Sequence, residues 1–574
     1  MQNIDKNNLG TNFDNNDILR NKFKKVCSII KDIVGSTYGP AGTFAMLPRA
    51  NVFMPPLATK DGISVFKSLR FDDETEQEIN KIIREASTKS NDIAGDSTTV
   101  SAILLTSFIL NYLNMLDNEE LRNKYSIFLD NTNNIFFNYA KFQNEVNSIR
   151  DYILSLLTKK SKQVKNIKDI YNIALTSSNG DKEIASLISS AYNSIGLDGL
   201  VLLGTSDTEE DYIKVKKGLI LETTSSSPIF YKNNTNGIYK DCLVLVSELA
   251  INTNYDILPI LEYVSKIQKP LIIFAPSFER EPLNTLIENF KKGSVQAIPI
   301  VIPGYQQSQD NYMHDIAVAT NSTIISLKNG LTLDCVKDSS LLGQAKDITI
   351  TQKEVSIIDG QGDYNKIQER IETIKSEILA YNKGAYGLEV LKKELASLSG
   401  GICKIYLGAK SEFELKERLD RLEDSICAID ASLNKGYLIG GCSIYIYLIT
   451  KLQEKYKNII DKSLALNLII SMLKEPIYQL LGNGGICITN IEVKDNILIL
   501  YKNNKEYSYE ITDNLGFDLS NLDIDFTIPT NLKNKNIKDT TLGIYTAINS
   551  VLSIAPICIR SKSMLLKKLK ENVY

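Results

Sequence analysis

Tryptophan is absent from this chain of 574 residues, and histidine occurs only once, at His314. A single imidazole cannot build a multi-histidine zinc site, and it leaves little material for Ser-His or Cys-His catalysis. We therefore expect any chemistry to depend on carboxylates. The eight cysteines contain no C-x-x-C pair. This spacing is typical of reduced, mostly buried thiols and predicts a cytoplasmic protein.

The chain also lacks a surplus of basic residues and a long apolar run. It has 65 Lys and Arg against 68 Asp and Glu, so we expect no nucleic-acid partner. The most apolar stretch, residues 102–115, is interrupted by Asn111 and Asn114 and is shorter than the roughly 18 residues of a membrane span. The Asn-rich segment 1–17 has no apolar signal-peptide core. The sequence therefore predicts neither a membrane partner nor secretion.

The remaining composition is that of a large globular protein. Hydrophobic residues make up 43% of the chain and charged residues 23%, which argues against disorder. A chain of 574 residues is too long for one core, and the usual domain size gives about three or four units.

Apolar spacing predicts helices at both ends of the chain and an α/β domain between them. Helices are predicted over 18–33, 79–94, 98–113 and 542–554, with a strand-rich patch over 486–509. The helix over 98–113 is apolar nearly all round, as in the middle of a domain. In the centre, strands over 243–246, 271–274 and 298–302 alternate with helices over 257–267 and 282–290. Residues 367–378 and 388–398 predict an antiparallel helix pair.

Three short motifs near the N-terminus are rich in glycine, hydroxyl and acidic residues. In the motif 95–99, hydroxyls and backbone N–H groups would lie at the start of the buried helix, which is a natural phosphate cradle. Taken alone, the motif is better explained by helix capping, and only the other motifs favour a phosphate site. A carboxylate pair and a glycine pair follow near the other end. The set is Thr37-Tyr38-Gly39-Pro40-Ala41-Gly42, Thr59-Lys60-Asp61-Gly62, Gly95-Asp96-Ser97-Thr98-Thr99, Glu423-Asp424 and Gly440-Gly441.

These residues are suited to phosphate chemistry. A magnesium ion that bridges phosphates prefers one or two carboxylates, which makes Asp96 the candidate ligand. Hydrolysis of a γ-phosphate needs a group that orients a water molecule and accepts its proton, and Asp61 and Asp424 are the candidates.

In this order the motifs resemble the nucleotide site of the group I, GroEL-like chaperonins. The resemblance implies a multidomain α and α/β subunit that hydrolyses ATP, with Mg²⁺ and K⁺ as candidate cofactors, to promote protein folding. It implies a mainly α equatorial domain (1–159 and 436–574), a small α/β intermediate domain (160–216 and 401–435) and an α/β apical domain (217–400). Gly218, Gly400, Gly401 and Gly436 are candidate hinges between them.

The resemblance also implies roles for single residues. Asp61 and Asp424 would act on the attacking water, and Asp96 would bind magnesium. Thr37 and the Lys60 carbonyl are candidates for a potassium ion, and Gly441 would lie against the base or ribose. The implied nucleotide-binding residues are Thr37, Tyr38, Gly39, Pro40, Lys60, Gly95, Asp96, Ser97, Thr98, Thr99 and Gly441.

Some positions depart from the family pattern. Ala41 stands where a lysine is usual, Ser97 replaces a glycine, and Cys442 replaces the third residue of a Gly-Gly-Gly run. The late aspartate that contacts ribose has no clear match within 528–539, where Asn534 or no carboxylate aligns. Because the other three carboxylates are retained, we expect hydrolysis with an altered rate or affinity.

The family binds unfolded polypeptides on apolar apical helices. The matching residues are Ile229, Phe230, Leu258, Leu261, Leu283 and Ile287, and the alternative for each is packing in the α/β core. Ser225 and Glu288 make this groove more polar than usual, which predicts a different client range or co-chaperonin affinity.

The family assembles sevenfold rings, often two back to back. Asp181 and Arg421 match a pair that couples neighbouring subunits within a ring. The stretches 476–479 and 484–487 lack the charges that usually join two rings, so we favour a single ring. The expected partners are other copies of the chain, unfolded polypeptides and a candidate co-chaperonin, in the cytoplasm or, for a viral protein, the host cytoplasm. The alternatives are an ATP-inert holdase or scaffold ring, and a small-molecule kinase with the same phosphate loops.

Overall fold

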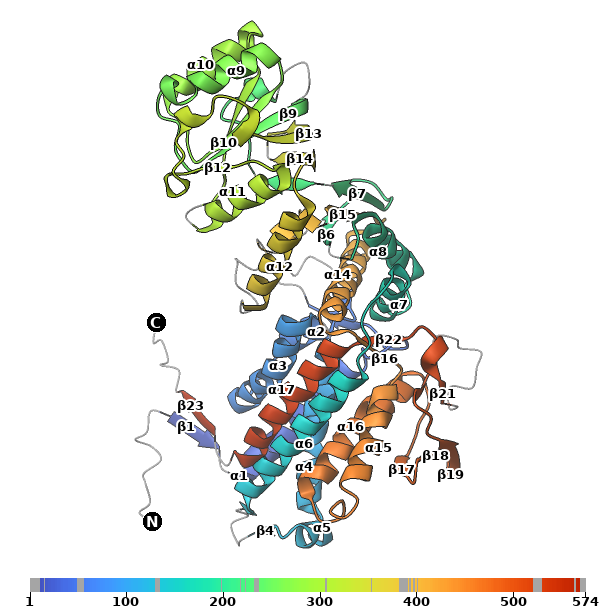
Figure 1. The fold of residues 1–574 in the computed structure, drawn as a ribbon. Helices are drawn as coiled ribbons and strands as arrows, with labels where there is room; N and C mark the ends of the chain where they lie inside the picture. The colour runs from blue at the N-terminus through green and yellow to red at the C-terminus, as the bar shows by residue number, and fades with distance from the viewer. Residues whose placement is uncertain are drawn as a thin grey trace. The chain divides into compact units, whose positions relative to one another are not determined.

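The computed structural model describes residues 11–14, 16–48, 56–95, 97–129, 135–197, 199–216, 218–221, 223–231, 237–304, 307–352, 354–380, 391, 394–395, 398–399, 401–519, 529–561 and 564–567. The chain divides into two compact units (Figure 1). The first comprises Met1–Ser189, Thr205–Asp211 and Leu407–Tyr574, and the second Ser190–Gly204 and Tyr212–Tyr406. Both ends of the chain therefore belong to one unit. The three-domain boundaries that the resemblance implies stay a prediction.

Helix α4 (Thr98–Asp117) lies at the centre of the first unit. It is buried without interruption over residues 100–109, because its side chains are apolar nearly all round. The helices that pack against it are α1 (Asn16–Gly35), α3 (Glu74–Ala94), α16 (Leu464–Asn483) and α17 (Thr541–Arg560). A further long helix, α6 (Tyr139–Lys160), packs on α16 and α17. This bundle confirms the helices predicted at both ends of the chain.

Three of these helices, α4, α16 and α17, are long and apolar enough to cross a membrane by length and composition alone. The expectation that no stretch reaches that length was therefore wrong, since Asn111 and Asn114 leave the mean hydropathy of α4 at 1.5. Most of each helix is nevertheless buried inside the unit, between 67% and 78% of the apolar window. Their apolar surface is used for helix packing.

The rest of the first unit consists of shorter elements around this bundle. The strands pair as antiparallel ribbons, apart from one three-stranded meander, β17–β18–β19, which confirms the predicted strand-rich patch. The helices are α2 (Gly62–Ser68), α5 (Glu119–Lys124), α7 (Ile167–Ser177), α8 (Lys182–Ile195), which continues into the second unit, α14 (Glu412–Lys435) and α15 (Ser443–Lys455). The strands are β1 (Thr11–Asp14) with β23 (Met564–Lys567), β2 (Ala45–Leu47) with β3 (Leu57–Thr59), β4 (Phe128–Leu129) with β5 (Ile135–Phe136), β16 (Tyr437–Ile439) with β22 (Lys538–Thr540), β20 (Leu515–Gly516) with β21 (Thr530–Asn531), and β17 (Asn490–Lys494), β18 (Ile497–Lys502) and β19 (Lys505–Glu510).

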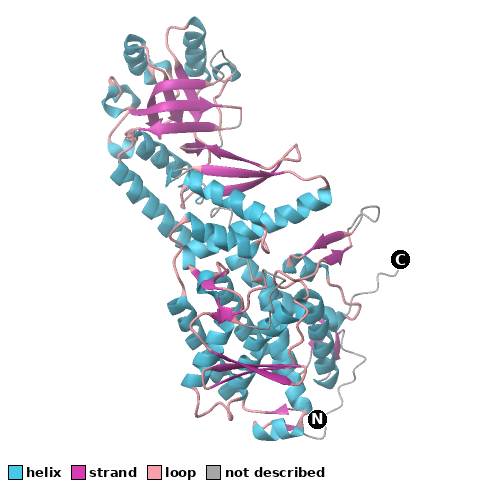
Figure 2. Cartoon of the chain, turned by 90° about the vertical axis from the view of Figure 1, so that its right-hand side faces the viewer, coloured by secondary structure: helices cyan, strands magenta, loops and turns pink. Residues whose placement is uncertain are grey.

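The second unit is built on a seven-stranded mixed sheet (Figure 2). Strands β11 (Ala297–Val301), β10 (Leu271–Ala275) and β9 (Ile238–Ser247) are parallel, and β12 (Ile324–Ile325) also pairs with β9. Strands β13 (Gly343–Ile350), β14 (Val355–Gly360) and β8 (Leu219–Leu221) continue the sheet in antiparallel fashion. A separate three-stranded sheet joins β6 (Leu200–Thr205), β15 (Ile402–Leu407) and β7 (Tyr212–Lys216).

Both faces of the large sheet are buried. Val244 and Val246 of β9 enter one apolar core with α11 (Gln307–Thr320), while Leu243 and Leu245 enter the opposite core with α9 (Leu258–Ile267) and α10 (Arg280–Lys292). A strand buried on both faces has a continuous apolar sequence, which is why these strands could be predicted.

A buried cluster of charged residues joins α11 to α12 (Tyr364–Ala380) in the second unit. The Arg370 Nε atom donates to Asp315 Oδ1 at 2.7 Å, and Asp315 is fully buried. Glu394, from the second helix of the predicted pair, is 3% exposed. In the described part of the chain, both of its carboxylate oxygens, Asp315 Oδ2 and Arg370 Nη2 have no hydrogen-bond partner. Buried polar groups of this kind are costly when ionised.

Burial raises the pKa of Glu394 to about 8, and the charges of Asp315 and Glu377 add to this shift against the opposing effect of Arg370. Burial likewise raises the pKa of Asp315 to about 6. In an unfolded chain both carboxyl groups would have a pKa of about 4. Because the folded values are higher, this contribution to stability is complete below about pH 4 and is lost as the pH rises through 6 and 8.

We therefore expect the second unit to become less stable between about pH 5 and pH 8.5, and we expect Glu394→Gln to remove most of that loss because an amide cannot ionise. Hydrogen exchange of the α11 and α12 amides at a series of pH values would measure the opening free energy of this unit. Glu369→Gln, at an exposed position of α12, is the matched control and should keep the pH dependence of the unmodified chain. Equal pH dependence in the Glu394 variant would contradict the assignment.

Candidate functional site

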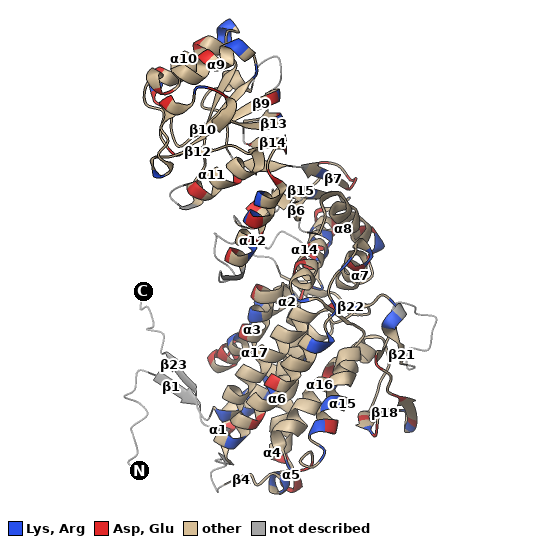
Figure 3. Cartoon of the chain, in the orientation of Figure 1, with Lys and Arg blue, Asp and Glu red and all other residues tan. Residues whose placement is uncertain are grey.

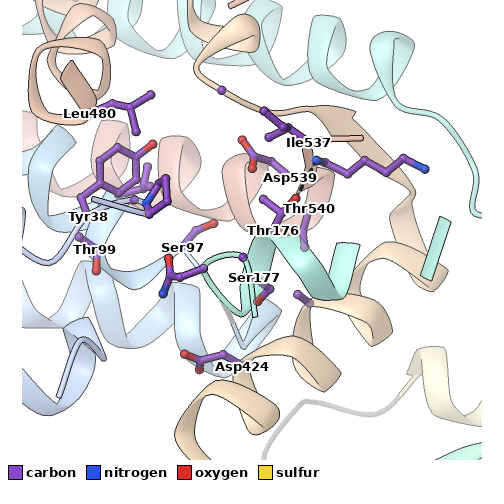
Figure 4. A pocket seen from close by; sticks show the side chains of 18 of the residues that line it. Tyr38, Ser97, Thr99, Thr176, Ser177, Asp424, Leu480, Ile537, Asp539 and Thr540 are labelled. Carbon is purple, nitrogen blue, oxygen red and sulfur yellow. Dashed lines mark hydrogen bonds between the residues drawn. The ribbon is translucent and has the colours of Figure 1, made fainter. Parts of the chain in front are cut away.

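A cavity of about 820 Å³ opens in the first unit and is lined by residues from both ends of the sequence (Figure 4). All the described residues predicted for nucleotide binding and hydrolysis line it, while Asp96 lies outside the described residues. The lining includes residues 37–41, 60–62, 95, 97–100, 175–177 and 179–180 from the N-terminal part, and Asp424, Gly441, Cys442, Leu480, Phe517, Leu519 and 535–540 from the C-terminal part. Folding thus brings together motifs that are more than 380 residues apart in sequence.

One end of the cavity is formed by the N-terminus of α4. Thr98, Thr99 and Val100 of its first turn line the cavity, and the preceding Ser97 makes no side-chain capping bond. The backbone N–H groups at a helix start have no partner within the helix, and the helix dipole places partial positive charge there. Helix capping was the alternative for the isolated motif. The Ser97 side chain does not make such a capping bond, so capping does not explain why a serine is at this position. This end is suited to an anion such as a phosphate.

Ser97 and Cys442 stand where the family pattern has glycine, and both keep the backbone that glycine favours. Their φ angles are 64° and 62°, in the left-handed region. A non-glycine residue pays about 1 to 2 kcal/mol for this conformation. The chain therefore preserves the two turns at the cavity although the glycines are replaced.

Glycines allow close approach of the cavity walls. A Cβ atom added to Gly62 would lie 2.3 Å from Thr99 Oγ1, so α2 and α4 could not meet as they do with any larger residue. A Cβ atom on Gly95 would lie 2.4 Å from Cys427 Cβ, on the helix that carries Asp424. The motif before α4 and the helix α14 are therefore in direct contact.

Asp61 is held rigidly at the start of α2. Its Oδ1 and Oδ2 atoms accept from Ile63 N at 3.1 Å and Ser64 N at 3.0 Å, and its own N–H donates to Thr59 Oγ1 at 3.0 Å. An ionised carboxylate has about four acceptor sites, so each oxygen keeps one for a ligand or water. Asp61 is thus a fixed acceptor on the cavity wall.

Helix α14 brings Asp424 to the same cavity, on a helix with charged residues of both signs (Figure 3). One turn earlier, Asp420 pairs with Lys416 at 2.6 Å. Burial raises the pKa of Asp420, and the charge of Asp61 raises it further. Sequence analysis did not identify Asp420, because an aspartate four residues from a lysine on a helix is ordinary surface patterning.

The pair Asp181–Arg421 forms within one chain. Arg421 Nη1 lies 3.4 Å from Asp181 Oδ2, and its Nη2 lies 2.5 Å from Glu417 Oε1. Within this chain the loop before α8 and the helix α14 therefore face one another, and the coupling of neighbouring subunits by this pair stays a prediction. The Arg421 charge and burial together lower the pKa of Lys60, with burial the larger cause.

The other end of the cavity is apolar. It is lined by Tyr38, Leu480, Phe517, Leu519 and Ile537. Gly441, at φ 59°, lies against this wall, and a Cβ atom there would be 2.3 Å from Phe517 O. An aromatic and aliphatic slot of this kind is typical of the part of a pocket that holds a flat apolar group.

Asp539 is a cavity residue that sequence analysis missed. It lies on β22, next to Thr540, whose side chain caps α17 by accepting from Gly543 N, and it lines the cavity near the apolar end. For the residue that contacts ribose, the segment 528–539 was predicted to provide Asn534 or no carboxylate. Asn534 belongs to the short helix Leu532–Asn534, and Asp539 supplies a carboxylate to the cavity. The usable signal was an aspartate directly before the capping threonine of an apolar helix.

The chemistry of the cavity fits a magnesium-bound phosphate ligand. Among the described residues, no three His, Cys, Asp or Glu side chains are grouped to hold a metal ion alone. Magnesium held through phosphates needs only one or two carboxylates, so such a site does not require a group of three protein ligands. None of the eight cysteines is placed in a disulfide, and five of them are buried, as expected for mostly buried thiols.

In the second unit, the residues predicted to bind polypeptide differ in burial. Leu258 is 48% exposed at the start of α9, while Ile229, Leu283 and Ile287 are half-buried. Phe230 and Leu261 are buried in the two cores, as the core-packing alternative allowed. Ser225 is buried and donates to Pro299 O at 2.9 Å, so it adds no polarity to the surface. Glu288 is exposed and pairs with Lys291.

The described candidate hinges have left-handed backbones that require glycine. The φ angles are 93° at Gly218, 103° at Gly401 and 77° at Gly436. Gly400 lies outside the described residues. Their function as hinges stays a prediction.

The fold is similar to that of a solved chaperonin. The chaperonin gp146 from the bacteriophage EL 2 (Pseudomonas aeruginosa), crystallised in the presence of ATP-BeFx, matches in crystal form I with a TM-score of 0.63, covering 96% of this chain and 99% of that one. Crystal form II matches over the same shares with a TM-score of 0.57. At 20% sequence identity the likeness shows the fold, and it confirms the predicted fold class.

Sequence comparisons give the family. The model of the TCP-1/cpn60 chaperonin family matches residues 30–568. The chaperonin GroEL of Carsonella ruddii (strain PV) is 31% identical over 475 residues, which cover 82% of this chain and 86% of that protein. The chain, with its motifs assembled around one cavity, belongs to the TCP-1/cpn60 chaperonin family.

Proposed function

We propose that the cavity of the first unit binds and hydrolyses ATP, and that this hydrolysis drives the folding of other proteins. Family membership implies an ATP-dependent folding chaperone. The observation that carries the proposal for this chain is one cavity that joins the N-terminus of α4 to carboxylates from separate segments, Asp61 and Asp424. The related gp146 was crystallised with ATP-BeFx, which fits a nucleotide at this place.

The polarity of the cavity orients the nucleotide. The phosphates lie at the α4 end, where Thr98 and Thr99 and the backbone N–H groups donate hydrogen bonds. The base lies in the apolar end, and Asp539 accepts from the ribose hydroxyls between the two. In the loop 37–41, Thr37, Gly39 and Pro40 approach the phosphates from the side of α1, while Tyr38 lines the apolar end.

Hydrolysis uses two carboxylates of the cavity. Asp61, held by the start of α2, and Asp424, carried by α14, orient a water molecule in line with the γ-phosphate, and one of them accepts its proton. A bound magnesium ion would neutralise charge on the phosphates, with Asp96 as its protein ligand. The Thr37 and Lys60 backbone carbonyls are the proposed partners of a potassium ion.

Asp424→Ala should retain ATP binding and lose turnover, because it removes a proton acceptor and leaves the phosphate end intact. We expect steady-state ATP hydrolysis to fall by about a hundredfold or more. Refolding of a denatured model enzyme should fall with it. Glu423→Ala is the matched control, since Glu423 is the neighbouring carboxylate, is exposed and does not line the cavity.

The outcome separates the chaperonin from its alternatives. If the unmodified chain captures unfolded protein and hydrolyses no ATP, it is a passive holdase or scaffold ring. If hydrolysis requires a small acceptor molecule, it is a kinase. Equal loss in the Glu423 and Asp424 variants would remove Asp424 from the hydrolysis step.

We further propose that the second unit captures unfolded polypeptides through exposed apolar residues of α9 and α10. Leu258 is the strongest of these residues, because it is the most exposed of the predicted set. An exposed leucine at the start of a helix can contact an apolar client without unfolding the domain.

Leu258→Ser should weaken capture of an unfolded client without lowering the melting temperature, whereas Leu261→Ser should lower the melting temperature because Leu261 is 7% exposed and buried in the core. Leu327→Ser changes another exposed leucine of the same unit and should affect neither property. Co-sedimentation with a denatured enzyme measures capture. Unchanged capture by the Leu258 variant would place the client site elsewhere.

For assembly we propose a single sevenfold ring in the cytoplasm, of the host if the protein is viral, with a co-chaperonin as a candidate partner. In the stretch that corresponds to the contact between rings in the family, Tyr478 and Gln479 make contacts within the chain: Tyr478 OH accepts from Ile491 N, and Gln479 donates to Asn483. Neither offers a charge to a second ring.

Light scattering in the presence and absence of ATP should therefore give the mass of one ring. Addition of salt should change this mass little, since no charged contact between rings is expected. A stable double ring under both conditions would contradict the proposal.

A further inference from the structure

Tyr38 is held at both ends on the wall of the cavity. Its carbonyl oxygen accepts from Asn483 Nδ2 at 2.8 Å, and the same Nδ2 donates to Gly35 O at 3.0 Å. The Asn483 side chain is itself oriented by Gln479 Nε2, which donates to its Oδ1 atom at 2.9 Å. At the other end, the Tyr38 hydroxyl lies 3.9 Å from Cys442 Sγ. The ring is therefore fixed relative to both α16 and the turn before α15.

The surroundings leave the ring neutral. Burial raises the pKa of Tyr38 well above its usual value, and the nearby Cys442, Tyr445 and Asp539 raise it further. The phenol therefore stays protonated at all ordinary pH values. A neutral, fixed aromatic ring in an apolar slot is a suitable partner for another flat ring.

The opposite wall of the slot comes from another segment. Figure 4 shows the Tyr38 ring on one side of the cavity, next to Leu480, with Ile537 and Asp539 across from it. A flat group that enters the cavity between these two walls would contact the aromatic ring on one side and the aliphatic residue on the other. The carboxylate of Asp539 lies beside this space, on the side that leads toward the phosphate end.

We propose that Tyr38 selects the purine base of the nucleotide by stacking on it. This proposal rests on the proposed function of the cavity as a nucleotide site. Stacking of a base on an aromatic side chain grows with the area of overlap, so a two-ring purine gains more than a one-ring pyrimidine. The hydroxyl is turned to Cys442, so the ring face and not the hydroxyl carries the selection.

Binding of MgADP and MgCDP, measured by titration calorimetry, tests this, since neither diphosphate is hydrolysed by an ATPase and both carry the same ribose and phosphates. Tyr38→Leu should weaken MgADP about tenfold, the usual size of a stacking contribution. It should weaken MgCDP less, so that the preference for the purine falls. Tyr38→Phe keeps the ring and should keep the preference.

Tyr507→Leu, at an exposed position on β19 away from the cavity, is the control for loss of a tyrosine and should bind as the unmodified chain does. An unchanged ADP to CDP ratio in a folded Tyr38→Leu variant overturns the inference and leaves the nucleotide site standing. Equal losses in the Phe and Leu variants overturn it as well, because the hydroxyl would then carry the contact. If the unmodified chain binds neither diphosphate, the proposed function and the inference both fail.

Discussion

The packing of one apolar helix, α4, determines both the core and the site of this protein. Because α4 is apolar all round, it must be surrounded, and α1, α3, α16 and α17 surround it. Each of these helices begins or ends beside the cavity. The loop after α1 contains residues 37–41, and Gly95 follows the end of α3. Asn483, the last residue of α16, donates to this loop at Tyr38 O, and α17 begins just after Asp539 and Thr540. The start of α4 supplies the partial positive charge. The cavity is thus where the ends of one helix bundle converge.

Backbone geometry at the cavity is retained where side chains have changed. Ser97 and Cys442 adopt left-handed conformations that cost a non-glycine residue about 1 to 2 kcal/mol each. Strain of this size persists only where the surrounding structure fixes the turn. At Ser97 the turn places the first N–H groups of α4 on the cavity, and at Cys442 it places the thiol beside Tyr38. The turns, rather than the glycines, are the feature that the site needs.

The charged groups of the two units have different physical tasks. In the first unit, Asp61, Asp424 and Asp539 line a cavity of about 820 Å³, where their oxygens can reach a ligand. In the second unit, Asp315 and Glu394 are buried among the described residues, and burial favours their protonated forms. The same residue type therefore serves a ligand site in one unit and makes packing sensitive to pH in the other.

The sequence by itself determined the family, the long helices and the parallel strands, because these depend on local apolar periodicity and on short motifs with fixed spacing. It also named twelve described residues that line one cavity, since each lies in a motif of glycine, hydroxyl or carboxylate residues. Tertiary structure alone decided contacts between distant segments. Asp539 joins the site only because β22 pairs with β16, and the pair Asp181–Arg421 closes within one chain only because α14 faces the loop before α8. Likewise, burial separated Leu258 from Leu261, which have the same residue type and lie on the same helix. Exposure and pairing depend on what the rest of the chain places nearby, and local sequence does not contain that information.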